Sequence, residues 1–157
     1  MKRAPITKTA IGRVRKGRRS DAQAILTLED LFSTDRMTIR SVRRFLSVPH
    51  AHVWIAELDG VVVGNLIWLS RSGSRAARVY SVVVAPAARG QRFAQRLVQT
   101  MERDARSEGH EIAMLEVRAD NPAARALYAK LGYVEVAKLP DFYEDGGDGL
   151  KLVKPLG

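Results

Sequence analysis

Residues 82–94 have the composition of an anion-binding turn. They read Val-Val-Val-Ala-Pro-Ala-Ala-Arg-Gly-Gln-Arg-Phe-Ala, which is an apolar strand, a short loop of small residues and the start of a helix. The first backbone N–H groups of a helix have no intrahelical partner and carry partial positive charge, so they can bind a diphosphate. Arg89 and Arg92 add positive charge there. An ordinary strand-to-helix connection explains the same stretch.

Glu116 and Tyr128 are two residues further along the chain whose side chains can move protons. Glu116 belongs to an apolar strand and shares a face with Ile112 and Met114. A carboxylate in such a strand is costly unless it is paired or used. Tyr128 lies two turns into the next helix, on its apolar face. The structural alternatives are a solvent-facing acid at a strand end and an amphipathic core tyrosine.

Hydrophobic periodicity and turn signals predict the elements that must position these residues. Strands are expected at residues 11–15, 52–58, 61–69, 78–84, 112–117, 133–139 and 149–153, and helices at 22–32, 38–47, 91–108 and 121–131. The Asp59-Gly60 turn predicts an antiparallel hairpin, whereas the strand–helix–strand unit of residues 78–117 implies a parallel pair. We therefore expect a single-domain α/β fold with a mixed seven-stranded sheet and about four helices.

Capping residues and apolar spacing refine the helices. Asp21 is the expected N-cap of the helix at residues 22–32, and Asn121 with Pro122 is expected to begin the helix that carries Tyr128. The long helix at residues 91–108 has apolar side chains spaced four apart, at Phe93, Leu97, Met101 and Ala105.

Composition limits the class of protein. The 157 residues, 46% hydrophobic and 27% charged, correspond to one globular domain. The absence of cysteine excludes disulfides, Fe–S clusters and a cysteine nucleophile. Three histidines without clustered carboxylates predict no metal site. No apolar run is long enough to cross a membrane, and no secretory signal is visible, so we expect a cytoplasmic protein without a membrane partner.

The net charge of +9 is concentrated near the N-terminus. Eight of the 26 Lys and Arg residues fall within residues 1–20, whereas all 17 Asp and Glu residues lie beyond them. We expect residues 1–9 to form a basic arm and residues 10–157 the folded domain. Such an arm can bind nucleic acid. It has no aromatic residue to stack on bases, and a solvated tail also explains it.

The two stretches together resemble the GNAT superfamily of acyl-CoA N-acyltransferases, over roughly residues 10–155. The phosphate-loop pattern of that superfamily is Arg/Gln-x-x-Gly-x-Gly/Ala. It is met here by Arg89, Gly90, Gln91, Arg92, Phe93 and Ala94, with Arg92 in place of the usual glycine.

The second stretch is similar to the branch of this superfamily that acetylates protein N-termini, including a ribosomal-protein alanine. The pattern of that branch is Leu-Glu-Val-Arg-x-x-Asn followed by Ala-x-x-Leu-Tyr-x-x-x-Gly-Phe/Tyr. Residues 115–121 and 124–133 match it, and residues 141–146 resemble its Tyr-Tyr-x-Asp-Gly segment.

The resemblance implies a site in which acetyl-CoA lies where two neighbouring strands splay apart. Backbone groups of Val82 and Val84 would pair with the pantetheine amides, and Asn121 would contact the pantetheine arm. The N–H groups from Arg89 to Ala94 would hold the diphosphate. Glu116 would be the general base, through a water, and Tyr128 the general acid that protonates the departing thiolate. The lack of cysteine favours direct transfer, because no cysteinyl acyl-enzyme can form.

The acceptor stays open. Closeness to the N-terminal branch favours a peptide or protein α-amine, and a small-molecule amine is the alternative. The acids of the last loop, Asp141, Glu144, Asp145 and Asp148, would attract a cationic amine or form a solvated hairpin loop. A non-catalytic acyl-CoA sensor and a nucleic-acid-binding protein are the rival functions, and a homodimer is possible on this sequence.

Overall fold

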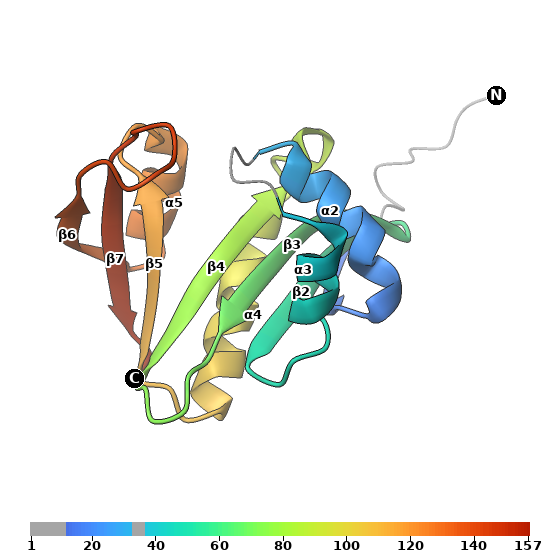
Figure 1. Cartoon of the computed structure of the whole chain (residues 1–157), viewed down its shortest axis with the longest axis horizontal. Coiled ribbons are helices and arrows are strands. Elements are labelled where there is room, and N and C mark those ends of the chain that lie inside the picture. Colours follow the sequence, from blue (N-terminus) through green and yellow to red (C-terminus); the bar gives the residue numbers. More distant parts are fainter. Residues whose placement is uncertain (1–11, 33–36) are drawn as a thin grey trace.

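The computed structural model describes residues 12–32 and 37–157, so the expected basic arm at residues 1–9 lies outside the described residues. Its centre is one mixed sheet of seven strands in the order β1-β2-β3-β4-β5-β7-β6 (Figure 1). The strands are β1 (Gly12–Lys16), β2 (Ala51–Leu58), β3 (Val61–Leu69), β4 (Ala76–Val84), β5 (Ile112–Arg118), β6 (Val134–Leu139) and β7 (Gly149–Pro155). The predicted fold class is confirmed.

Neighbouring strands run in opposite directions throughout the sheet, except for one pair. Strands β1 to β4 pair in antiparallel fashion, and β5, β7 and β6 do the same. Strands β4 and β5 form the parallel pair between these two halves. In the β2–β3 turn, Asp59 and Gly60 have positive φ angles of 52° and 81°, as a two-residue hairpin turn of type I′ requires. The predicted hairpin and the predicted parallel pair are both confirmed.

Helices cover both faces of the sheet (Figure 1). They are α2 (Ala22–Asp30), α3 (Ile39–Phe45), α4 (Phe93–Ser107) and α5 (Pro122–Lys130). Helices α2 and α3 share one apolar cluster with Ile67 of β3, while α4 and α5 share a larger cluster with the next residue, Trp68. Because successive side chains of a strand point to opposite faces, α2 and α3 lie on one face and α4 and α5 on the other.

Helix α4 confirms the predicted apolar face. The four side chains spaced four residues apart are at most 1% exposed: Phe93, Leu97, Met101 and Ala105. The helix begins at Phe93 rather than at the predicted residue 91. The preceding Gly90 and Arg92 have positive φ angles of 89° and 60°, and L-residues in an α-helix do not adopt such angles.

Helix α2 begins at Ala22 with Asp21 as its N-cap residue, as predicted, but the Asp21 side chain makes no cap hydrogen bond to the helix. Asp21 also ends a short 3₁₀ turn, Arg19–Asp21. Its buried carboxylate instead accepts hydrogen bonds from the Arg18 backbone N–H, at 2.7 Å, and from the Arg15 guanidinium. The carboxylate that the sequence pattern predicted to cap α2 therefore binds Arg15 on β1.

Candidate active site

Strands β4 and β5 separate soon after they meet, as Figure 1 shows. They pair only from Ala76 to Arg78 on β4 and from Ile112 to Met114 on β5. Beyond Arg78, β4 stays paired with β3 and β5 stays paired with β7. A gap therefore opens inside the sheet, and three connected hollows lie around it.

The first hollow, about 630 Å³ in volume, lies on the α4 and α5 face and is called the donor hollow below. It is lined by all but one of the expected cofactor-binding residues, namely Val82, Val84, Arg89, Gly90, Arg92, Phe93, Ala94 and Asn121. Gln91 is the exception, because it does not line the hollow.

Free backbone donors face this hollow where α4 begins. The first intrahelical hydrogen bond of α4 runs from the Arg96 N–H to the Arg92 carbonyl, at 2.9 Å. The N–H groups of Phe93 and Ala94 come before it and have no helical partner. The Arg89 N–H, in contrast, already donates to the Pro86 carbonyl at 3.2 Å. The unpaired N–H groups at this end of α4 therefore come after Arg89.

Arg92 stands in the left-handed region, with φ 60° and ψ 26°, as the N-cap residue of α4. Glycine adopts this conformation without cost, whereas a side chain with a Cβ is strained there. The GNAT phosphate-loop pattern has glycine at this position, and Arg92 keeps the backbone conformation that glycine favours. With arginine in place of glycine, the turn is kept and a basic residue lines the donor hollow.

Asn121 has a structural role at the edge of the donor hollow. Its side-chain oxygen accepts a hydrogen bond from the Ala124 N–H at 3.1 Å and so caps α5, as predicted. Its amide nitrogen is then the group left for a ligand. Helix α5 in turn carries Tyr128 into the same hollow.

Tyr128 is 6% exposed and packs edge-on against Tyr133, with the ring centroids 5.5 Å apart. Within residues 12–32 and 37–157, its hydroxyl forms no hydrogen bond. Burial raises the pKa of this hydroxyl above its usual value. The group therefore stays protonated at neutral pH and has a proton to donate.

Glu116 lies on the opposite face of the sheet. In β5, Ala113, Leu115 and Val117 are buried, while Ile112, Met114 and Glu116 alternate with them and are partly exposed. The Glu116 carboxylate accepts a hydrogen bond from the Arg78 guanidinium at 2.9 Å. The shared face with Ile112 and Met114 is confirmed, and Arg78 is the partner that the sequence did not reveal.

A second hollow, about 460 Å³, lies on the α2 face and is called the acceptor hollow. Glu116 lines it, with side chains from α2, β4, β5 and the β6–β7 loop, including Glu29, Arg78, Tyr80, Ser81, Arg118, Phe142 and Tyr143. The sequence patterns included Arg118, Phe142 and Tyr143 among these. Glu29 and Arg78 gave no signal, because each is an ordinary charged residue in a predicted element.

A third, smaller cavity of about 220 Å³ joins the two sides through the gap between β4 and β5. It shares Val82, Asn121 and Tyr128 with the donor hollow and Glu116 and Tyr143 with the acceptor hollow. The structure thus brings Glu116 and Tyr128 to one cavity from different elements. A proton acceptor and a proton donor face the same space.

The four acids of the β6–β7 loop do not line the acceptor hollow. Asp148 accepts a hydrogen bond from the Asp141 N–H at 3.0 Å, and Asp145 accepts from the Gly147 N–H and from Arg118. Asp145 and Asp148 therefore form hydrogen bonds that order the loop, while all four acids remain exposed to solvent.

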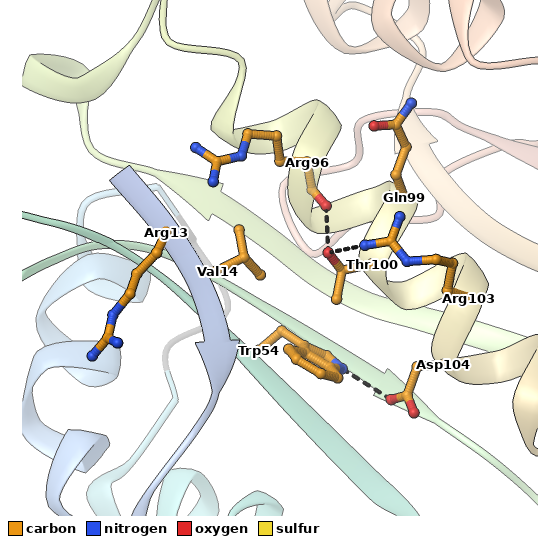
Figure 2. A pocket seen from close by; sticks show the side chains of 8 residues that line it. All are labelled: Arg13, Val14, Trp54, Arg96, Gln99, Thr100, Arg103 and Asp104. Carbon is orange, nitrogen blue, oxygen red and sulfur yellow. Dashed lines mark hydrogen bonds between the residues drawn. The ribbon is translucent and has the colours of Figure 1, made fainter. Parts of the chain in front are cut away.

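A larger hollow of about 730 Å³ lies between β1 and α4, away from the gap (Figure 2). Arg13, Arg96 and Arg103 line it, but their guanidinium groups lie apart in Figure 2. Arg13 bonds to Glu57, and Arg96 bonds to the Gly12 carbonyl. None of the expected site residues lines it. Separately, no group of metal-ligating side chains and no membrane-spanning helix occurs among the described residues.

Two hollows on opposite faces of a sheet, joined through a gap between its parallel strands, suit the transfer of a group between two bound molecules. Helix N–H groups without a helical partner lie on one side, and Glu116 and Tyr128 both line the cavity at the gap. The chain belongs to the acetyltransferase (GNAT) family, whose model matches residues 21–133, and it is an N-acetyltransferase.

Curated relatives span nearly the whole chain. The N-alpha-acetyltransferase RimI of Mycobacterium tuberculosis is 32% identical over 144 residues, covering 88% of this chain and 89% of the relative. An uncharacterized N-acetyltransferase of Methanocaldococcus jannaschii is 29% identical over 143 residues, covering 90% of each chain. The ribosomal-protein-S18-alanine N-acetyltransferase of Escherichia coli has the same fold, with a TM-score of 0.83 at 20% identity, covering 94% of this chain and 95% of that one.

Proposed function

We propose that this enzyme transfers the acetyl group of acetyl-CoA directly to the α-amine of a peptide or protein. The observation that carries the proposal is the cavity between β4 and β5 that both Glu116 and Tyr128 line. The peptide acceptor is supported by similarity to a relative named as an N-alpha-acetyltransferase. The proposed partners are thus acetyl-CoA and a protein or peptide N-terminus, with the cytoplasm as the place of reaction.

The donor hollow is the proposed site of acetyl-CoA. The N–H groups that precede the first bond of α4, with Arg92, would hold the diphosphate. Backbone groups of Val82 and Val84 would pair with the pantetheine amides, and the Asn121 amide nitrogen would contact the same arm. The thioester would then lie at the gap beside Tyr128, which lines both the donor hollow and the smaller cavity.

Glu116 and Tyr128 would act on opposite sides of the reacting carbonyl. Glu116 takes a proton from the acceptor amine through a water, so that the nitrogen can attack the thioester carbon. As the C–S bond breaks, Tyr128 gives its proton to the departing sulfur. The new C–N bond leaves one extra proton on the nitrogen, and this proton passes through water to the tyrosinate, so that Tyr128 is restored. The products are an amide and free CoA thiol. Because the described chain contains no cysteine, no thioester intermediate on a cysteine is formed.

The donor half of the proposal is tested by a thermal melt with acetyl-CoA. At a concentration of about 100 times Kd, a ligand that binds only the folded state stabilises it by about 2.7 kcal/mol. For a chain of this size, the expected rise in melting temperature is about 5–10 °C. A melting temperature unchanged at millimolar acetyl-CoA contradicts the assignment of the donor hollow.

The acceptor half is tested by mass spectrometry of the products formed from a mixed library of peptides and small-molecule amines. We expect acetylated peptide N-termini, with release of an equal amount of CoA thiol. Products confined to small-molecule amines would contradict the peptide acceptor, and no thiol release with any amine would favour the acyl-CoA sensor.

A further inference from the structure

Glu29 is a buried carboxylate near the end of α2, with 3% of its surface exposed. Its Oε2 accepts hydrogen bonds from the Asn65 amide at 3.0 Å and from the Ser81 hydroxyl at 2.7 Å. Both donors are neutral. No basic side chain in the described part of the chain forms an ion pair with it.

The other buried carboxylates of the described chain differ from Glu29 in this respect. Asp21 pairs with Arg15, Glu57 pairs with both Arg13 and Arg15, and Glu102 pairs with Lys154. A carboxylate removed from water without a cation is costly. Glu29 is therefore the buried acid whose positive partner is missing from the described residues.

Glu29 lies where a substrate cation would arrive. It lines the acceptor hollow, where the other carboxylate, Glu116, is already paired with Arg78. Its partner Ser81 directly precedes Val82 in β4, and Val82 lines both the acceptor and the donor hollow. The carboxylate therefore lies on the acceptor side and is bonded to the residue next to the proposed pantetheine contact.

We propose that Glu29 is the anionic contact for the acceptor, binding its amine while that amine is still the charged ammonium. This inference rests on the proposed transfer to an α-amine. The ammonium supplies both the missing positive charge and the hydrogen-bond donors that neutral Asn65 and Ser81 provide only in part. Glu116 then removes the proton that must leave before attack. Glu29 thus selects acceptors that arrive as cations.

Steady-state kinetics of Glu29→Gln with a peptide that begins with alanine test this role. We expect the KM for the peptide to rise at least about tenfold, because one partner of a buried charge contact is lost. The KM and Kd for acetyl-CoA should stay within about twofold, because the donor hollow lies on the other face. Glu57→Gln is the matched control: it removes a similarly buried carboxylate, 8% exposed and paired with arginines, far from the acceptor hollow. Its peptide KM should not change.

A measurement on the wild-type enzyme covers the case in which Glu29→Gln does not fold. In the presence of CoA, which cannot acetylate, the alanyl peptide should bind at least about tenfold more tightly than the same peptide with a neutral propionyl group in place of alanine. Equal affinities, or an unchanged peptide KM in folded Glu29→Gln, overturn the inference. If the wild type acetylates no peptide at all, the proposed function fails instead.

Discussion

The donor and acceptor hollows are built in different ways. The donor hollow takes most of its lining from two short stretches, residues 82–94 and 121–128, and offers mainly backbone groups. The acceptor hollow combines α2, β4, β5 and the β6–β7 loop, and it offers charged and aromatic side chains. Backbone N–H groups suit the diphosphate of acetyl-CoA, which is the same in every reaction cycle. Side chains from separate elements can be replaced one at a time, which suits recognition of a particular acceptor. Under the proposed function, donor binding would therefore depend on local chain geometry, and acceptor choice would depend on tertiary contacts.

The largest expected effect comes from Tyr128→Phe, which tests the point where the two hollows meet. Removing the general acid should lower kcat about 10²–10⁴-fold, measured at saturating substrates. The affinity for acetyl-CoA should change little, and so should stability, because the hydroxyl has no hydrogen-bond partner among the described residues.

Tyr133→Phe is the matched control for this change. The Tyr133 hydroxyl donates to the buried Glu102 at 2.8 Å, so its loss should lower the free energy of unfolding by about 1–3 kcal/mol. The kcat should remain near that of the wild type. A Tyr128→Phe enzyme with a wild-type kcat would make Tyr128 a core residue only.

Glu116→Gln tests the acceptor side of the same cavity. We expect kcat to fall about 10²-fold, the lower end for a general base. A variant that keeps the wild-type rate would show that Glu116 serves only to bind Arg78.

Gly90→Val tests whether the donor side depends on backbone conformation. Gly90 has a φ of 89°, and a Cβ there would meet nothing within 4 Å. The expected cost is therefore conformational, about 1–2 kcal/mol of stability. The affinity for acetyl-CoA should fall roughly tenfold, because the altered turn no longer aims its N–H groups at the diphosphate.

Gly60→Val is the control that separates the loss of stability expected for Gly90→Val from its loss of affinity for acetyl-CoA. Gly60 has a φ of 81° and equally open surroundings, but it lies in the β2–β3 turn. It should lose similar stability in a denaturant titration and keep its affinity for acetyl-CoA. Equal affinities for Gly90→Val and Gly60→Val would contradict a backbone site for the diphosphate.

The smallest expected effect comes from Asp145→Asn, which loosens the acceptor side. Asp145 bonds to Arg118, and the Arg118 guanidinium lies over the Tyr143 ring at 4.7 Å from its centroid. We expect the peptide KM to rise about two- to fourfold, as for an exposed ion pair, with acetyl-CoA affinity unchanged. An unchanged peptide KM would separate the loop from acceptor binding.

The contact between Asp145 and Arg118 should also affect how the peptide KM of the wild-type enzyme depends on pH. The Gly147 N–H and the Arg118 guanidinium hold the pKa of the Asp145 carboxyl below its usual range. A lowered pKa keeps the contact charged as the pH falls through the ordinary aspartate range, and it is lost only at lower pH. The wild-type peptide KM should therefore stay below that of Asp145→Asn as the pH falls through the ordinary aspartate range. The two values should become equal only at lower pH, where Asp145 is protonated.

Structural features that depend only on neighbouring residues could be predicted from the sequence. The Asp59-Gly60 turn, the apolar spacing of α4 and the cap of α5 by Asn121 are all local, and the structure confirms them. The order of elements and the motif in residues 82–94 also predicted a mixed sheet with the donor residues at the start of one helix. Short-range hydrogen bonds and periodicity carry this information, so it is readable along the chain.

Which charged side chains meet depends on the tertiary structure. The Asp21 carboxylate binds Arg15 rather than an N–H group of α2, Glu116 binds Arg78, and Glu29 is buried without a basic partner among the described residues. These outcomes depend on side chains brought together from distant elements. The cost of a buried charge depends on its surroundings, and no local pattern records what lies across a sheet or beneath a helix. The side chains proposed to bind the acceptor therefore could not be predicted from the sequence and were found only from the folded structure.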